Sequence, residues 1–336
     1  MPTLFDLTKP IVVAPMAGGP STPELVSAAS AAGALGFLAA GYRSVADLMD
    51  QITETRASAG LFGVNLFVPE EDQGDLDAAR AYRDQLRTLA EQLGVPHLPE
   101  PTPDDDAFDA KIEALLDDPV PFVSFTFGCP DSPLVRRLRD RGTTVLATVT
   151  CVDDAARAEA AGVDALIVQG PEAGGHRATF ACVSEPGTTS LGQLVTQVKL
   201  ASELPLVATG GLASPIMVAS AFRIADAVQV GTAFLLADEA GTSAAHRAAL
   251  VDPAFTETAV TRAFSGRPAR GLQNRFMEEY GPAAPPAYPA VNQVTTPIRR
   301  AAAAAGDLQH VHLWAGTGWQ EARPGPAEEI VDRLLG

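Results

Sequence analysis

A glycine-rich segment with one histidine carries the clearest potential for chemistry in this chain. It reads Gln-Gly-Pro-Glu-Ala-Gly-Gly-His-Arg over residues 169–177 and follows the apolar run 163–168, which predicts a buried strand. Gly174 and Gly175 lack a Cβ atom, so the backbone can approach a ligand closely there. His176 could supply an acid or base that titrates near neutral pH. The segment therefore predicts a ligand site at a strand end, with a glycine turn carrying an incidental histidine as the alternative.

Two more glycine-bearing segments lie at the ends of apolar runs. Thr-Gly-Gly at 209–211 follows the run 205–208, and Gln-Val-Gly-Thr at 229–232 closes the run 227–230. Glycines leave backbone N–H groups free to point at phosphate oxygens, and a threonine hydroxyl can donate as well. Together the two segments predict a phosphate-binding site. Its predicted members are Gly210, Gly211, Gln229, Val230, Gly231 and Thr232.

Side chains at other strand ends would face the same pocket. Asn65 ends the run 61–67, and Gln169 follows the run that precedes the histidine segment. An amide both donates and accepts, which suits the edge of a heteroaromatic ring. Pro15 and Met16 follow the first apolar run and would place apolar atoms beside such a ring. The alternatives are amides satisfied within the loops and a methionine that only packs.

The elements that must position these residues alternate between short apolar runs and helical patterns. This alternation predicts βα units and a parallel sheet. About eight units fit a (β/α)8 TIM barrel, in which function lies on the loops after the strands. A doubly wound open sheet is the alternative, but the Gly-x-Gly-x-x-Gly pattern typical of that fold is absent after the first run. The predicted strands are 11–14, 34–38, 61–67, 122–127, 144–149, 165–168, 205–208 and 227–230.

One region interrupts this alternation of strands and helices, and another follows it. Residues 1–238 are predicted to form the barrel, with an insertion after the third strand at about 69–119 that is too polar for a core of its own. Residues 239–336 do not alternate, and we expect a mostly helical lid or subdomain over the barrel mouth. The helices expected in this tail are 244–250, 259–264, 270–277, 298–305 and 327–335.

Composition narrows the classes of partner. The chain has 336 residues and a net charge of -17, which argues against nucleic acid or an anionic membrane as a partner. Its three cysteines are too few and too scattered for a disulfide framework or a zinc site, and no metal site is expected. Cys129, within Gly-Cys-Pro, could act as a nucleophile, although buried cysteines are usually inert. No segment resembles a signal peptide or a membrane span, so we expect a cytoplasmic protein.

Five segments, taken in order, resemble motifs of the nitronate monooxygenase family, formerly called 2-nitropropane dioxygenases. The resemblance runs from Pro10 to about Phe276, and Leu-Trp-Ala-Gly-Thr-Gly at 313–318 is similar to the family's C-terminal motif. The five segments are 15–18, 63–67, 169–177, 208–211 and 229–232.

The resemblance implies a non-covalently bound FMN and a role for His176 as catalytic acid or base. The implied reaction is the oxidation of an alkyl nitronate by O2 to a carbonyl compound and nitrite, and a neutral nitroalkane would first lose its α-proton to His176. This small substrate and O2 are the implied partners, while a homodimer stays open. The FMN contacts implied by the resemblance are Asn65, Gln169, Gly174, Gly211 and residues 229–232.

Three positions depart from the family pattern and put the substrate, more than FMN, in question. Thr126 stands where many relatives carry histidine, Ala178 where glycine is usual, and Asn292 where some have a tyrosine. An NAD(P)H-dependent FMN reductase for an enoyl thioester or a quinone is one alternative, because related FMN barrels share a similar Gly-Gly-His loop. A non-catalytic flavin-binding protein is another. Structural or surface roles are expected for the remaining histidines, His97, His246, His310 and His312.

Overall fold

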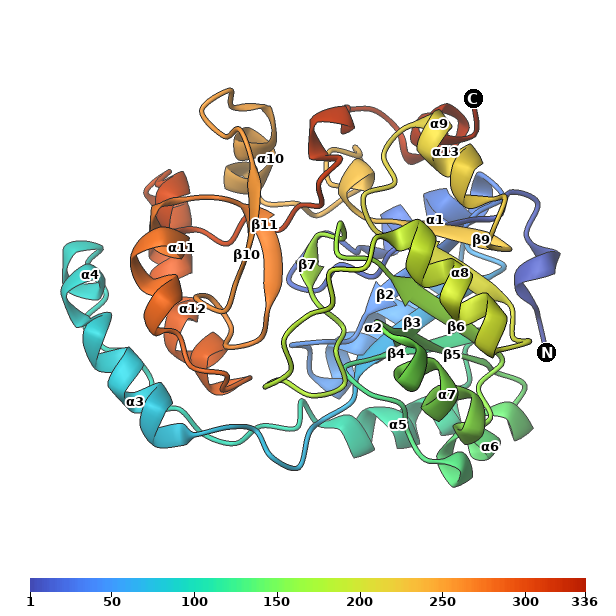
Figure 1. Ribbon diagram of the computed structural model, residues 1–336, viewed down its shortest axis with the longest axis horizontal. Helices are drawn as coiled ribbons and strands as arrows, with labels where there is room; N and C mark the ends of the chain where they lie inside the picture. The colour runs from blue at the N-terminus through green and yellow to red at the C-terminus, as the bar shows by residue number, and fades with distance from the viewer.

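Eight parallel strands close into a barrel in the computed structural model, which describes residues 1–336 (Figure 1). Neighbouring strands follow chain order, and β9 closes the barrel by pairing with β1. This arrangement confirms the predicted TIM barrel and excludes the doubly wound open sheet. The barrel strands are β1 (Ile11–Val13), β2 (Leu35–Ala39), β3 (Phe62–Phe67), β4 (Phe122–Thr126), β5 (Thr144–Val149), β6 (Ala165–Gln169), β8 (Leu206–Thr209) and β9 (Ala227–Val230).

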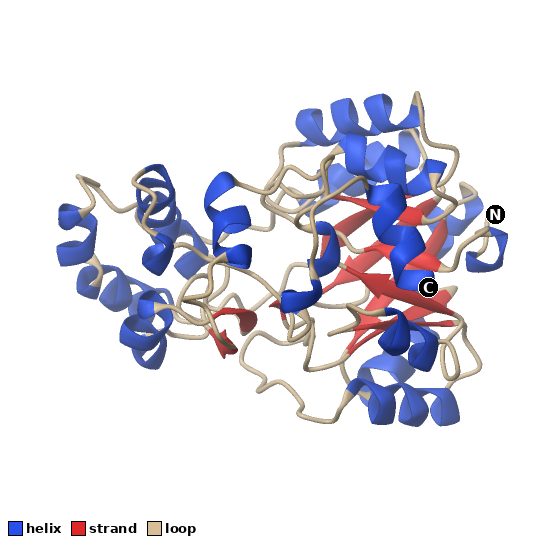
Figure 2. Cartoon of the chain, turned by 90° about the horizontal axis from the view of Figure 1, so that it is seen from above, coloured by secondary structure: helices blue, strands red, loops and turns tan.

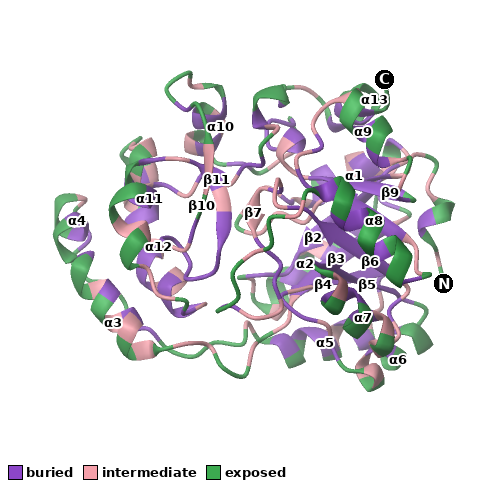
Figure 3. Ribbon diagram, in the orientation of Figure 1, coloured by how far each residue is buried: buried purple, intermediate pink, exposed green.

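Apolar side chains fill the barrel and the layer around it. Phe37, Phe122 and Ile167 come from three different strands and pack in one cluster inside the barrel. Leu4, in the short 3-10 turn Leu4–Asp6, joins this cluster and plugs one end. Figure 3 shows the barrel strands buried along nearly all of their length. Because both faces of a parallel strand are covered, such strands appear as near-continuous apolar runs in the sequence.

One helix follows each barrel strand and covers the barrel from outside (Figure 2). Several begin at a side-chain cap, which satisfies a backbone N–H group of the first turn. Thr22, Ser44 and Asp131 each accept a hydrogen bond from the backbone N–H three residues later. The barrel helices are α1 (Pro23–Ala31), α2 (Val45–Arg56), α5 (Phe108–Asp117), α6 (Ser132–Asp140), α7 (Val152–Ala161), α8 (Leu191–Ala201), α9 (Pro215–Ala221) and α13 (Ala327–Leu335).

Two of these helices place the end of the insertion and the end of the tail lobe at other residues than predicted. The insertion was expected to reach residue 119, but α5 packs on α2 and buries Ile112 and Leu115 in the outer barrel core. The insertion therefore ends near residue 107. Similarly, α13 packs between α1 and α9, so residues 327–335 belong to the barrel and not to a lid. A short amphipathic helix has the same sequence pattern whether it covers a barrel or another lobe.

The insertion and the tail build a second lobe together. Helices α3 (Leu76–Gln85) and α4 (Arg87–Gln92) lie beside α12 (Ala290–Ala304), at the left of Figure 1. Tyr82 of the insertion packs in one core with Phe264 and Phe276 of the tail, and its hydroxyl donates to the Ala263 carbonyl at 2.8 Å. The insertion lacks a core of its own because the tail supplies the other half.

A small antiparallel sheet connects the lobe to the barrel. Its strand order is β10 (Thr258–Thr261), β11 (Ala269–Leu272), β7 (Gly175–His176). The helix expected at 259–264 is therefore wrong, and the β-branched residues around Val260 favour the observed strand. The helix expected at 270–277 is wrong in its first half, since α11 (Arg275–Tyr280) begins only after its cap, Asn274.

The other tail helices agree with expectation in type. Helix α10 (Ala244–Val251) lies where it was predicted, whereas α12 begins at Ala290 instead of 298 and carries Pro297 within it. None of the helices has both the length and the apolar character that crossing a membrane requires.

Candidate active site

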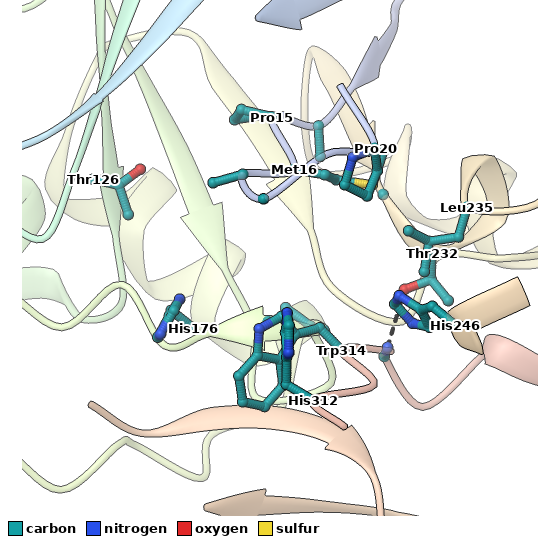
Figure 4. Close-up of a pocket in the computed structure, with 18 of the residues that line it drawn as sticks. Pro15, Met16, Pro20, Thr126, His176, Thr232, Leu235, His246, His312 and Trp314 are labelled. Carbon is teal, nitrogen blue, oxygen red and sulfur yellow. Dashed lines mark hydrogen bonds between the residues drawn. The ribbon is translucent and has the colours of Figure 1, made fainter. Parts of the chain in front are cut away.

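A cavity of about 480 Å³ lies at the carboxyl ends of the barrel strands, beneath the tail. Every residue predicted for the site lines it, including His176 and both glycine segments of the predicted phosphate site. In Figure 4, Pro15 and Met16 lie on one side of the space, across from His176, His312 and Trp314. The predicted residues found in the cavity wall are Pro15, Met16, Asn65, Gln169, Gly174, Gly175, His176, Gly210, Gly211, Gln229, Val230, Gly231 and Thr232.

The backbone around His176 is fixed from two directions. As part of β7, His176 pairs with Ala269 of β11. From the barrel side, Gln169 donates through Nε2 to the His176 carbonyl at 3.1 Å and accepts from the Ala178 backbone N–H through Oε1 at 3.0 Å. Both ends of the Gln169 amide are thus engaged by the histidine loop. Gln169 lines the cavity, but its polar atoms position His176.

The His176 ring is held by one side-chain contact. Its Nε2 lies 2.8 Å from Ser265 Oγ, whose hydroxyl lies 3.2 Å from the Arg267 carbonyl. If the serine donates to that carbonyl, it accepts from a protonated Nε2, which leaves Nδ1 as the basic nitrogen. Nδ1 has no protein partner. The arrangement therefore presents an unprotonated imidazole nitrogen, the form needed to accept a proton.

Aromatic rings enclose this histidine. The ring centroids of Phe127, Tyr288 and Trp314 lie 5.6, 5.8 and 5.6 Å from that of His176. Burial, and to a smaller extent the positive charge of Arg299, lower the His176 pKa to about 4. The imidazole is therefore neutral at physiological pH and available as a base.

Asn65 presents one end of its amide to the cavity. Its Nδ2 donates to the carbonyl and the hydroxyl of Ser124 at 3.2 and 2.9 Å, and to Thr126 Oγ1 at 3.0 Å. These bonds leave Oδ1 as an acceptor for a ligand N–H group. Thr126, one of the departures from the family pattern, therefore orients Asn65.

The two glycine segments form a cradle of free backbone donors. The N–H groups of Gly211 and Gly231 donate to no protein acceptor. Gly211 has φ = +70°, which a residue with a Cβ adopts only at a cost. Thr232 Oγ1 accepts from the Gly316 N–H at 3.0 Å, which fixes the hydroxyl beside them. Nearby, the buried Gln229 Oε1 has no protein partner, so its amide is free to bind a ligand.

The cavity wall carries positive but no negative side chains. Neither aspartate nor glutamate is among the lining residues, although the whole chain has a net charge of -17. The positive side chains are Arg299 and Arg300, whereas His176, His246 and His312 in the same wall are neutral at physiological pH. The site thus favours anionic ligands despite the field of the whole protein.

The sequence reasoning missed several of these groups. His246 and His312 were expected at structural or surface positions, but both line the cavity. Burial lowers the pKa of His246 to about 4 and that of His312 well below its usual range. Ser265 was not singled out either. These residues come from the tail. The tail lacks the regular alternation of strands and helices from which a position facing the pocket could be predicted.

The fold and the site define a class, a (β/α)8 barrel enzyme whose ligand cavity lies at the strand ends under a tail-derived lobe. The sequence matches the nitronate monooxygenase family over residues 2–336, and the chain belongs to this family. The chain is accordingly an oxidoreductase of a flavin-dependent family.

Individual relatives agree with this assignment. The chain is 36% identical to a probable nitronate monooxygenase of Staphylococcus aureus (strain MSSA476) over 343 residues, covering 99% of this chain and 95% of that protein. A nitroalkane oxidase structure from Streptomyces ansochromogenes superposes with a TM-score of 0.94 at 45% identity, covering 98% of this chain and 96% of the other. FabK from Thermotoga maritima is similar at a TM-score of 0.74 and 27% identity, over 99% of this chain and 93% of the other.

Proposed function

We propose that this protein binds FMN and oxidises alkyl nitronates with O2 to carbonyl compounds and nitrite. Family membership supports flavin chemistry, and the nitroalkane oxidase from Streptomyces ansochromogenes supports nitro compounds as the substrate class. The observation that carries the proposal is His176, a half-buried imidazole that is neutral at physiological pH, in a cavity that has no carboxylate.

The donor set of the cavity fits FMN. The free N–H groups of Gly211 and Gly231 suit a phosphate, which needs several donors and space close to the backbone. Asn65 Oδ1 and the unpartnered Gln229 amide suit the polar edge of the flavin ring, which both donates and accepts. Pro15 and Met16 provide an apolar surface on the other side of the cavity.

FMN would supply the redox chemistry, and the side chains would supply position and proton transfer. His176 Nδ1 would take the α-proton of a neutral nitroalkane, while Ser265 and Gln169 hold the ring and its backbone in place. A preformed nitronate has already lost that proton. His176 would then serve it mainly as part of the binding surface.

Anaerobic flavin spectroscopy tests the proposed function. FMN-loaded protein would be mixed with ethyl nitronate in one cuvette and with NADH or NADPH in another, and the flavin absorbance followed. We expect rapid bleaching by the nitronate alone, reversed by air with release of nitrite.

Two results would contradict the proposal. Rapid bleaching by NAD(P)H but not by nitronate would favour the reductase alternative. A protein that takes up FMN but is bleached by neither donor would favour a non-catalytic flavin-binding role.

A further inference from the structure

One buried cation in the cavity wall lacks a negative partner. Arg299 of α12 is only 9% exposed and lines the cavity. Of the other buried cations, Arg267 contacts Glu70 and Lys111 contacts Asp106 at 2.8 Å. Arg177 donates to the Gly170 carbonyl and feels the charge of Glu172, but it does not line the cavity. Arg299 instead contacts only neutral oxygens. A buried charge without a counter-charge is costly, so its presence calls for an anion that binds there.

The bonds of Arg299 leave one nitrogen available. Nη2 makes all three contacts, to the Asn292 carbonyl at 3.0 Å, to Asn292 Oδ1 at 2.7 Å and to Thr296 Oγ1 at 2.6 Å. Nε is enclosed and has no partner. Nη1 has no protein acceptor and is not enclosed, so its two N–H groups can reach a ligand.

The position of Arg299 is close to the reacting histidine. Its charge is one of the two causes that depress the pKa of His176, and it acts on His312 as well. Burial lowers the pKa of Arg299 itself to about 10, which still leaves the guanidinium charged at neutral pH. Asn292 and Thr296 line the cavity beside it.

We propose that Arg299 is the anion receptor of the substrate pocket and binds an oxyanion of the substrate through Nη1. This inference rests on the proposed function, because a nitronate carries its negative charge on oxygen. A carboxylate elsewhere on the substrate would present the same chemistry to the guanidinium. Asn292 holds Nη2 from the other side and acts as a positioning residue.

The Asn292→Asp variant tests the proposal with little change in shape. The new carboxylate lies against Nη2 and pairs the guanidinium internally, so an external anion loses its attraction. The probe is propionate, titrated into FMN-loaded protein and followed by the flavin difference spectrum, with neutral propionamide as the matched ligand. We expect Asn292→Asp and Arg299→Met each to weaken propionate binding about 10- to 100-fold. Propionamide binding should change much less.

Arg275→Met is the control variant, since Arg275 is exposed and pairs only loosely with Glu279 at 4.0 Å. It should bind propionate as the wild type does. The proposal is overturned if Asn292→Asp holds FMN and binds propionate with wild-type affinity, or if propionate leaves the wild-type spectrum unchanged. Because the probe is inert, this result is independent of turnover. Failure of nitronate to bleach the wild-type flavin would instead count against the proposed function.

Kinetics then identify which oxyanion of the substrate Arg299 binds. KM would be compared between ethyl nitronate and a nitronate that also carries a carboxylate at its far carbon. A rise of KM for both substrates in Asn292→Asp assigns Arg299 to the nitronate group. A rise for the second substrate alone assigns it to the carboxylate and makes the protein selective for nitro acids.

Discussion

His176 is suited to the proposed role of base because its surroundings keep it neutral. Ser265 contacts one ring nitrogen, and three aromatic rings surround the imidazole. The same surroundings that lower its pKa to about 4 also make it a weaker base than a solvated histidine. As the proposed base, His176 would accept a proton over a broad pH range but would be less basic than a solvated histidine.

The His176→Asn variant tests the proposed role of this residue as a base. General base catalysis contributes about 100- to 10,000-fold, so kcat/KM for neutral nitroethane should fall by at least about 100-fold. With preformed ethyl nitronate the loss should stay below about 10-fold, because no proton must be removed. Steady-state oxygen consumption with both substrates measures this, after FMN content has been matched. Equal losses on the two substrates would contradict the role as a base.

The pH profile of the wild type provides a further check on the same residue. The base form of His176 exists above its pKa, so kcat/KM for nitroethane should be constant from neutral pH to about 5. It should fall only as the pH drops through about 4. If kcat/KM instead falls at a pH near the usual pKa of histidine, the His176 ring is solvated in the working enzyme.

At the scale of the elements, two loops meet so closely that no side chain fits between them. A Cβ on Gly174 would lie 2.4 Å from Gly316 N and 2.6 Å from the Ala315 carbonyl carbon. Both neighbours are backbone, so they cannot move aside as a flexible side chain could. The histidine loop after β6 and the tail segment near residue 316 are therefore packed directly on one another beside the predicted phosphate cradle.

The Gly174→Ala variant should accordingly lose stability and FMN together. We expect a cost of about 1–3 kcal/mol from overpacking, with a lower ratio of flavin to protein absorbance. Gly192→Ala is the matched control, since a Cβ there meets no atom within 4 Å and Gly192 lies within helix α8. That change should be neutral or stabilising by up to about 1 kcal/mol. Wild-type FMN content and unfolding temperature in Gly174→Ala would refute the close-packing argument.

The barrel elements could be predicted from sequence, whereas the tail elements could not. Each barrel strand is a buried apolar run, so its position follows from local composition alone. By contrast, β10 is short and half-buried, and its neighbour β11 is fixed by pairing with β7, more than 90 residues away in the chain. Helix α12 carries Pro297, which pointed to a later helix start.

The same contrast applies to the site. Glycines and amides at strand ends can be recognised from the sequence as candidate site residues, because the barrel places all strand ends around one opening. The packing of the second lobe brings three further residues to that opening, Arg299, Ser265 and His312. This packing cannot be predicted from the local sequence around them. Cys129, singled out as a conceivable nucleophile, does not line the cavity, and burial raises the pKa of its thiol to about 12.

At the scale of the whole molecule, three histidines with lowered pKa values, His246 buried and His176 and His312 half-buried, make stability depend on pH. The pKa values of His176 and His246 lie at about 4 and that of His312 is well below its usual range, mainly because of burial. In the unfolded chain each would titrate near 6.5, so below that pH the unfolded state binds protons that the native state does not. The free energy of unfolding should therefore be constant above pH 7 and fall as the pH drops from about 6.5 towards 4.

Urea unfolding of FMN-loaded protein between pH 4.5 and 8 would measure this slope. Each histidine contributes at most about 1.4 kcal/mol per pH unit, so His246→Gln should reduce the slope by about that amount. His97→Gln is the control, because His97 is exposed on the insertion, and its slope should match the wild type. An unchanged slope in His246→Gln would show that His246 is protonated in the folded protein.

The shared core of the second lobe has a consequence for synthesis of the chain. Helices α3 and α4 leave the ribosome about 200 residues before α12, with which they share one apolar core. At a translation rate of about 5–20 residues per second, their apolar faces stay without that partner for roughly 10–40 s. The outer helix layer of the barrel also stays incomplete until residues 327–335 have emerged, because α13 packs between α1 and α9. The cavity wall extends to Gly318, so the nascent chain has no complete cavity before that residue has emerged, and a cofactor that needs the whole cavity can bind only after that point.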